Sequence, residues 1–580
     1  MSKLRISIAL LVILTILTTA CTNGEVKQPD GESKQLENIF IEGQSGGDAE
    51  TLNWILAADG SSFGYVGHTL DSLATYDNDF NIELRCLARD VEASPDGLVH
   101  TVTIRDDLKW SNGSPVTAED YVYTMKNLMF SNWLNYNYKI SWQEEVNGDT
   151  VFVTPEVVND TTFTITRQTV DPEFAYTIYD LIPYPKHIAT KYEGDVEAFT
   201  QAPEFNNLTY TGNLGPYRFV EWIRNDKFVV ERNPEYYLGK DTGAPYFEKY
   251  ITKLFGTSAT MQAALEAGDI TYAGIEPDQA NKFRNLENVD VYTIPTRGYT
   301  LLAYNHRANG WEGLKNKVVR QALTMAVNKE VMSQAVLLGF GEPAFSFIPM
   351  TSPWYSEKDL VKYGVESLYD KQKAIEILEQ EGYRKTKEDG TAETVDKDGT
   401  PLTLIMATST GSEISTDMAA FIAREFSDLG IHVEQKLVPW ATLLRQYVMN
   451  TVPDTDQEPK FSNGPEAISQ EPWDLILMGF NTDLLAPSGS EVFFATQGDL
   501  NFFGSSSTEV DDLFKRAKSR EALNEDTRRQ IYVELSRVLS QEQPVNFLAF
   551  HRANRGFQKN VKGLEPGINM GYNYHLWHFE

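Results

Sequence analysis

Residue combinations that could support catalysis are sparse in this chain of 580 residues. A serine hydrolase uses a Gly-x-Ser-x-Gly turn together with a histidine and an acid, and the sequences around Gly489-Ser490 and Gly504-Ser505 lack that pattern. The His-Glu-x-x-His motif of zinc enzymes and the Gly-x-x-x-x-Gly-Lys-Ser/Thr loop of ATPases are absent as well. We therefore expect no enzymatic activity, and a secreted hydrolase is a disfavoured alternative.

Two segments could hold a metal ion. Asp396-Lys397-Asp398-Gly399 has a weak similarity to a calcium loop, but the bidentate glutamate that completes such a loop is missing at the required spacing. A hairpin turn is the better interpretation. His575 and His578 could share a metal, but Trp577 and Phe579 beside them favour docking of the C-terminal tail. We predict no metal and no cofactor.

One carboxylate remains as a candidate for binding chemistry. Residues 475–479 form an uninterrupted apolar run, which predicts a buried strand, and Asp483 follows shortly after its end. A charge-assisted hydrogen bond from an ammonium group to a carboxylate contributes about 1.5–3 kcal/mol. Aspartate is also common as a cap of turns, so Asp483 could instead only cap the turn that follows the strand.

The segment before this strand predicts the elements that position it. Residues 402–406 have the pattern of a strand, residues 418–426 place apolar side chains on one face of a helix, and residues 431–438 predict a second strand after Gly430. A strand, a helix and a second strand in this order form a β-α-β unit. We therefore expect an α/β lobe with helices packed on its sheet.

Composition and charge narrow the class of partner. The chain is 41% hydrophobic and 12% aromatic, which is typical of a globular protein with large cores. Its formal net charge of -31 opposes binding to a phosphate backbone, so we predict no nucleic-acid partner. We expect cationic or neutral partners, and a monomer.

The N-terminus predicts secretion. Lys3 and Arg5 precede an apolar run over residues 6–17, which is too short to span a bilayer and is typical of a signal peptide. Thr18-Thr19-Ala20-Cys21 resembles a lipobox, although Thr18 stands where leucine is preferred. We predict a signal peptide at 1–21, a lipid on Cys21 and a flexible tether at 22–37. The alternative is an ordinary signal peptide with an unmodified cysteine.

The stretch 98–128 combines a strand, a turn and a capped helix. Residues 99–104 alternate apolar and polar side chains, and Thr117 with Asp120 predicts a capping box at the start of a helix. The stretch resembles a signature of the extracytoplasmic solute-binding proteins of ABC importers, the oligopeptide/dipeptide/nickel family. The residues that carry the resemblance are, in order, Ile104-Arg105, Leu108-Lys109-Trp110, Asn112-Gly113, Pro115 and Thr117-Ala118-Glu119-Asp120.

Two further segments support this resemblance and follow in the order of the family. Residues 210–220, YTGNLGPYRFV, are similar to the family's Gly-Thr-Gly-Pro-Tyr turn. Residues 318–330, VVRQALTMAVNKE, are similar to a family helix, and their apolar spacing predicts a buried helical stripe. Together the three matches are spread over most of residues 38–580.

The resemblance implies a two-lobed periplasmic-binding-protein-like fold of type II, α/β with mixed sheets, an extra subdomain and a hinge between the lobes. It predicts a main domain, lobe I, formed by residues 38–80, 210–305 and 545–580. Residues 81–209 are predicted to form the extra subdomain of lobe I, and residues 306–544 to form lobe II.

The resemblance also implies where a ligand binds. In the oligopeptide-binding members, the strand that corresponds to residues 475–479 ends in backbone that pairs with the ligand, which here assigns Gly479, Phe480 and Asn481. An aspartate shortly after that strand binds the ligand's amine, and Asp483 matches its place. Trp440 corresponds to an aromatic residue that follows the β-α-β unit, and it could line the pocket or pack in the core.

These inferences predict a lipid-anchored extracytoplasmic receptor at the outer face of the cytoplasmic membrane or in the periplasm. It is expected to bind peptides between its closing lobes and to deliver them to ABC permease subunits and, through them, to an ATPase. An oligosaccharide is the alternative ligand, since residues 133–142 are rich in aromatic and amide side chains. That segment could equally be a packed loop. A further alternative is a sensor that binds a ligand without taking part in transport.

Overall fold

The computed structural model describes residues 38–45, 47–83, 86–134, 136, 138–388, 390–410 and 412–580. The predicted signal peptide, the lipidation site at Cys21 and the tether at 22–37 lie outside these residues. No helix within the described ranges is both long enough and apolar enough to cross a bilayer.

One eleven-stranded mixed sheet extends through two lobes. Its strand order is β10-β11-β12-β1-β13-β23-β14-β22-β18-β19, and β15 pairs with β23. The strands of the first lobe are β1 (Ile39–Gln44), β10 (Tyr217–Ile223), β11 (Lys227–Arg232), β12 (Lys249–Leu254) and β13 (Tyr272–Ile275). The strands of the second lobe are β15 (Gly341–Pro343), β18 (Thr403–Ser409), β19 (His432–Val438) and β22 (Leu475–Asn481).

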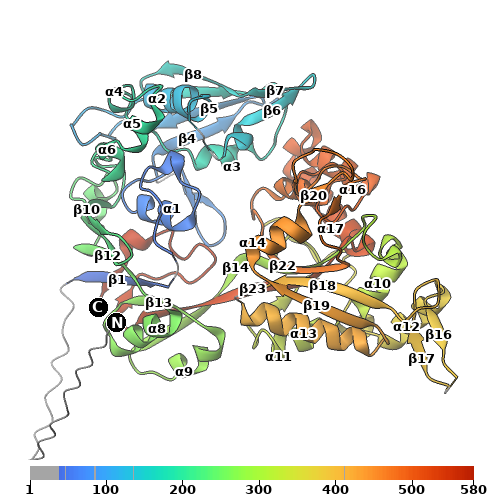
Figure 1. Cartoon of the computed structure of the whole chain (residues 1–580). Helices are drawn as coiled ribbons and strands as arrows, with labels where there is room; N and C mark the ends of the chain where they lie inside the picture. The colour runs from blue at the N-terminus through green and yellow to red at the C-terminus, as the bar shows by residue number, and fades with distance from the viewer. Residues whose placement is uncertain are drawn as a thin grey trace, which may run out of the picture. The chain divides into compact units, whose positions relative to one another are not determined.

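Two long antiparallel strands connect the lobes (Figure 1). They are β14 (Val289–Tyr304) and β23 (Val545–Gln558). The two strands pair with each other along most of their length, the last part of β23 also pairs with β13, and the last part of β14 also pairs with β22. Their register shifts between Pro295 and Tyr299. An interrupted ladder bends more easily than a regular one, so we expect the hinge between the lobes at this shift.

The second lobe has helices on both faces of its sheet, because β22 is apolar on both. Leu475 and Leu477 belong to the core formed with α10 (Lys317–Met325), α12 (Lys371–Gln380) and α13 (Glu413–Ser427). Ile476 and Met478 belong to the opposite core, with α16 (Thr508–Ala517) and α17 (Glu525–Glu542). The predicted β-α-β unit is confirmed, since α13 connects the parallel strands β18 and β19.

A separate four-stranded sheet extends the first lobe, in the order β4-β5-β9-β8. Its strands are β4 (Ala88–Ala93), β5 (Val99–Ile104), β8 (Thr154–Asn159) and β9 (Thr162–Thr166). Helix α2 (Ala118–Tyr123) begins at the predicted capping box of Thr117 and Asp120. Asp120 is buried and accepts hydrogen bonds from the backbone N–H of Thr117 and Lys186 and from the indole of Trp110.

Candidate functional site

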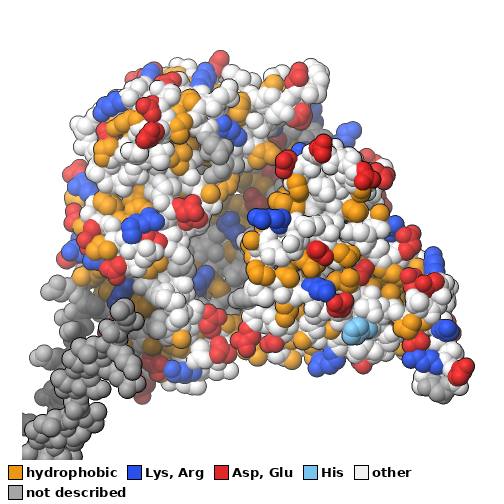
Figure 2. Space-filling model, viewed as in Figure 1, with side chains coloured by type: hydrophobic (Ala, Val, Ile, Leu, Met, Phe, Trp, Pro, Cys, Tyr) orange, Lys and Arg blue, Asp and Glu red, His pale blue; other side chains and the backbone are white. Residues whose placement is uncertain are grey.

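Three cavities lie along the junction between the lobes, and Figure 2 shows the molecule hollowed there. The aromatic cavity, of about 630 Å³, is lined by Asp180 and Asp483 among others. The arginine-lined cavity, of about 600 Å³, shares Asp180 with it and is also lined by Arg297. The strand-edge cavity, of about 510 Å³, begins at Gly298, the next residue of β14. The three cavities therefore adjoin.

The strand-edge cavity exposes backbone of β22. This strand pairs with β14 along its whole length, from Leu475 to Asn481. On its other edge it pairs with β18 only at residues 475–477. Within the described part of the chain, residues 478–481 have no strand on that edge, and Met478, Gly479, Phe480 and Asn481 line the cavity. An extended chain could form backbone hydrogen bonds there.

The structure brings four of the predicted ligand-binding residues to one cavity. Trp440 lines the strand-edge cavity together with Gly479, Phe480 and Asn481, and its side chain is 50% exposed. This exposure excludes the alternative in which Trp440 packs in the core. Asp483 does not line this cavity but the aromatic one, two residues beyond Asn481.

Asp483 both caps a turn and lines a cavity. Its Oδ1 accepts hydrogen bonds from the backbone N–H of Leu485, at 2.9 Å, and of Ala486, at 3.1 Å. Its Oδ2 makes no hydrogen bond to any described residue. The two interpretations of Asp483 are therefore compatible, because one oxygen holds the turn while the other is available to a ligand.

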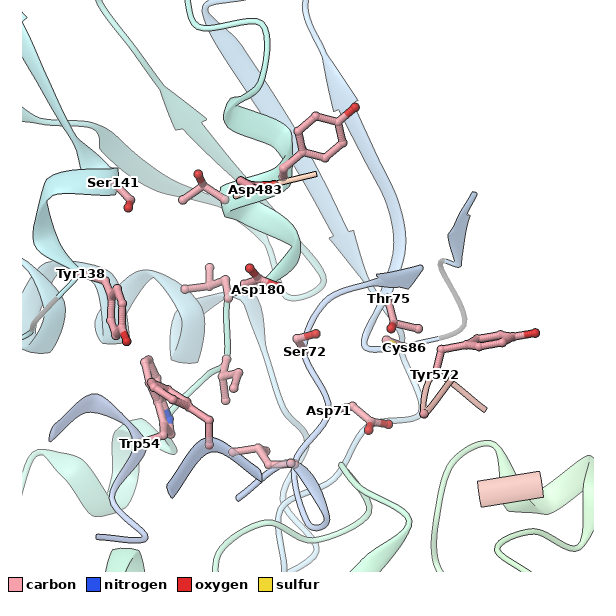
Figure 3. Close-up of a pocket in the computed structure, with 18 of the residues that line it drawn as sticks. Trp54, Asp71, Ser72, Thr75, Cys86, Tyr138, Ser141, Asp180, Asp483 and Tyr572 are labelled. Carbon is pink, nitrogen blue, oxygen red and sulfur yellow. The ribbon is translucent and has the colours of Figure 1, made fainter. Parts of the chain in front are cut away.

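A second carboxylate, Asp180, lines the aromatic cavity and lies near Asp483 (Figure 3). Asp180 is the residue that ends α3 (Phe174–Tyr179). Its side chain is exposed by surface area, but the concave wall around it limits its hydration. This desolvation, together with the negative charge of Asp483, raises the pKa of Asp180 to about 6, and Arg297 opposes the shift. Asp180 is thus partly protonated near neutral pH.

Sequence reasoning missed Asp180, and the reason is topological. Asp180 and Asp483 come from different lobes, and no local pattern links them. The segment 133–142 was recognised in the sequence as a possible ligand-facing surface, and Tyr136, Tyr138 and Trp142 do line the aromatic cavity. Trp142 is also buried, so the segment serves both as a packed loop and as a cavity wall.

Two segments do match Gly-x-Ser-x-Gly, at residues 43–47 and 60–64, in addition to the two glycine-serine pairs that lack this pattern. Ser62 lies within α1 (Gly60–Gly67), where its hydroxyl donates to Asp59 at 2.5 Å and accepts from the backbone N–H of Glu50. Ser45 contacts Ser258. Neither serine has a histidine hydrogen-bonded to it among the described residues, so these matches do not form a nucleophile with its base.

The two segments considered for metals have structural contacts. The backbone N–H of Gly399 donates a hydrogen bond of 2.8 Å to the carbonyl of Asp396 and closes a turn. This confirms the predicted hairpin turn. Near the C-terminus, Trp577 packs against Phe40 and Phe557, which confirms docking of the tail. In the described part of the chain, no group of three or more His, Cys, Asp or Glu residues could hold a metal ion.

Comparison with known proteins identifies the family. The profile described as "Bacterial extracellular solute-binding proteins, family 5 Middle" matches residues 85–501. The chain belongs to this family. A curated relative, the oligopeptide-binding protein AppA of Bacillus subtilis, is 26% identical over 583 residues, which cover 98% of this chain and 97% of AppA. The dipeptide-binding protein of Lactococcus lactis is 25% identical over 511 residues, 84% of each chain.

Solved structures of family 5 solute-binding proteins confirm the two-lobed fold. The ABC transporter substrate-binding protein CtaP of Listeria monocytogenes superposes with a TM-score of 0.75 at 21% identity, and the match covers 93% of this chain and 99% of CtaP. AppA of Bacillus subtilis, solved in complex with a nonapeptide, has a TM-score of 0.68 at 23% identity with the same coverage. At these identities the comparison with solved structures supports the fold of this family 5 member and not its ligand.

Proposed function

We propose that this solute-binding protein is an extracytoplasmic receptor, anchored to the membrane by a lipid on Cys21, that binds peptides between its lobes. It delivers them to the permease subunits of an ABC transporter. The observation that carries this proposal is the unpaired edge of β22 at residues 478–481, which lines a cavity and leads directly to the carboxylate of Asp483.

This arrangement matches the chemistry of a peptide. An extended peptide presents alternating N–H and C=O groups that can add to a free strand edge, while its side chains enter neighbouring pockets. Its terminal ammonium group needs an anion, and the second oxygen of Asp483 is available. The names of the relatives, an oligopeptide-binding protein and a dipeptide-binding protein, support the same class of ligand.

An oligosaccharide is the second candidate for one reason. Aromatic rings line the aromatic cavity, among them Trp54, Tyr136 and Trp142, and such rings stack on sugar faces. A neutral sugar, however, provides no positive charge for the carboxylates in the same walls. We therefore favour the peptide.

The test is to identify the ligand that the protein carries when it is purified. The protein is isolated under native conditions and unfolded, and the released small molecules are analysed by mass spectrometry. We expect peptides of mixed sequence. A discrete oligosaccharide, recovered in stoichiometric amount, would contradict the proposal.

A further inference from the structure

The aromatic cavity carries more negative than positive charge. Its walls include three carboxylates, Asp71, Asp180 and Asp483, and one histidine, His575, and no lysine or arginine is among the described residues that line it. Arg297, which lines the adjoining cavity, offsets part of the charge of Asp180. None of the three forms a salt bridge within the described part of the chain. Carboxylates in a concave protein wall are costly to leave uncompensated, and this charge favours a cationic guest.

Asp71 forms one end of the cavity. Its Oδ2 accepts hydrogen bonds from the hydroxyls of Tyr236, at 3.0 Å, and Tyr237, at 2.7 Å. Both partners are neutral, so they orient the carboxylate without cancelling its charge. Burial raises the pKa of Asp71 to about 6. In Figure 3, Asp71 and Asp180 lie on different parts of the wall, with Ser72 between them.

Aromatic rings form much of the walls. Nine aromatic residues line the cavity, and the faces of such rings attract ammonium and guanidinium groups while their surface accommodates an aliphatic stem. The cavity therefore combines negative charge with surfaces that suit the side chain of lysine or arginine.

We propose that the aromatic cavity takes the basic side chain of the bound peptide, so that the protein prefers peptides with a lysine or an arginine near the amino terminus. We place the basic residue near the amino terminus of the peptide because Asp483, the proposed partner of the terminal amine, lines the same cavity. This inference rests on the proposed function as a peptide receptor. A free polyamine has the same cationic chemistry, and the experiment separates the two.

The test is calorimetric titration of the full-length protein, freed of co-purified ligand, with matched tetrapeptides. Lysine is placed at position one or two of an alanine tetrapeptide and compared with norleucine, which has the same carbon chain without the ammonium group. We expect the better lysine peptide to bind at least tenfold more tightly than its norleucine counterpart. Equal affinities, or tighter binding of norleucine, overturn the inference while the proposed function stands.

Variants and a polyamine complete the design. We expect Asp71→Asn and Asp180→Asn each to lower the lysine-to-norleucine affinity ratio at least threefold. Asp226→Asn, in the exposed turn between β10 and β11, should leave the ratio unchanged. Asp180→Asn keeps the test valid if Asp71→Asn fails to fold. Ratios that stay at the wild-type value in both variants, or spermidine binding as tightly as the lysine peptide, overturn the inference. Absence of binding by every peptide contradicts the proposed function as well.

Discussion

Asp483 shows how one side chain can serve both the fold and the ligand. One of its oxygens accepts from two backbone N–H groups, and the other has no partner in the described part of the chain. Asparagine in its place would keep an acceptor for the turn but remove the charge. The substitution therefore separates the two roles, which alanine cannot do.

We predict that Asp483→Asn weakens the binding of peptides with a free amino terminus by roughly 10- to 150-fold, the equivalent of about 1.5–3 kcal/mol for a charge-assisted hydrogen bond. Titration calorimetry with free and N-acetylated versions of one peptide measures the effect. Asp512→Asn, an exposed aspartate of α16, is the matched control. An unchanged affinity for the free peptide would remove Asp483 from the site.

Asp180 makes binding depend on pH. Its pKa of about 6, raised by desolvation and by Asp483 and opposed by Arg297, means that the free protein holds a proton there between about pH 4 and 6. Asp71, also with a pKa of about 6, adds to the effect. A cationic ligand favours the ionised carboxylates and must displace these protons. Affinity for cationic peptides should therefore be highest above pH 7 and fall as the pH is lowered through 6.

Calorimetry at pH 5 and pH 8, in buffers of different ionisation enthalpy, measures both the affinity and the protons released. The number of protons released at pH 5 should be smaller in Asp180→Asn than in the wild type. Proton uptake on binding, or an affinity that rises as the pH falls, would contradict this account of the two carboxylates.

At the scale of elements, α2 depends on one buried carboxylate. Asp120 accepts four hydrogen bonds, from the backbone N–H of Thr117 and Lys186, from the hydroxyl of Thr117 at 3.4 Å and from the indole of Trp110. Removing it would leave the buried indole N–H of Trp110 and the part-buried N–H groups of Thr117 and Lys186 without this partner, and each unsatisfied buried donor costs about 1–3 kcal/mol.

We predict that Asp120→Ala lowers the free energy of unfolding by about 3 kcal/mol or more, measured by urea denaturation. Glu119→Ala is the control, because Glu119 forms only an exposed ion pair with Lys186, and such pairs contribute about 0–1 kcal/mol. Equal losses in the two variants would show that the capping box is not what holds this helix.

The same elements show what sequence could predict. The capping box at Thr117 and the β-α-β unit around α13 were accessible because each depends on residues close together in the chain. The strand that carries residues 478–481 was recognisable as an apolar run. Its free edge was not, since that depends on where β18 stops pairing. Asp71 and Asp180 could not be predicted as site residues for the same reason, because only the tertiary fold brings them into one cavity with Asp483. The assignment of residues 306–544 to lobe II remains a prediction.

At the scale of the whole described body, a buried contact joins the two lobes. Glu173, directly before α3, accepts hydrogen bonds from Ser488, through both its backbone N–H and its hydroxyl, and from the hydroxyl of Tyr532. Arg528 donates to the carbonyl of Pro172 beside it, at 2.8 Å. Burial raises the pKa of Glu173 to about 7, and nearby Asp171 adds to the shift while Arg528 opposes it.

This shift has a definite sign for stability. The folded protein holds a proton on Glu173 up to about pH 7, whereas the unfolded chain releases it near the ordinary glutamate pKa of 4.5. The contribution of Glu173 is therefore largest at low pH and is lost as the pH rises through 7. We predict that wild type loses stability relative to Glu173→Gln between pH 5 and pH 8. Urea midpoints of both proteins at the two pH values measure this, and a difference independent of pH would contradict it.

The central claim is that a peptide lies along β22 between the lobes with its amine at Asp483. A crystal structure of the protein with a bound lysine-containing tetrapeptide tests it most directly. The account predicts an extended peptide with its backbone hydrogen-bonded to residues 478–481, its terminal amine on the Asp483 carboxylate and its basic side chain in the aromatic cavity. A peptide bound elsewhere, or one whose amine lies away from Asp483, would contradict it.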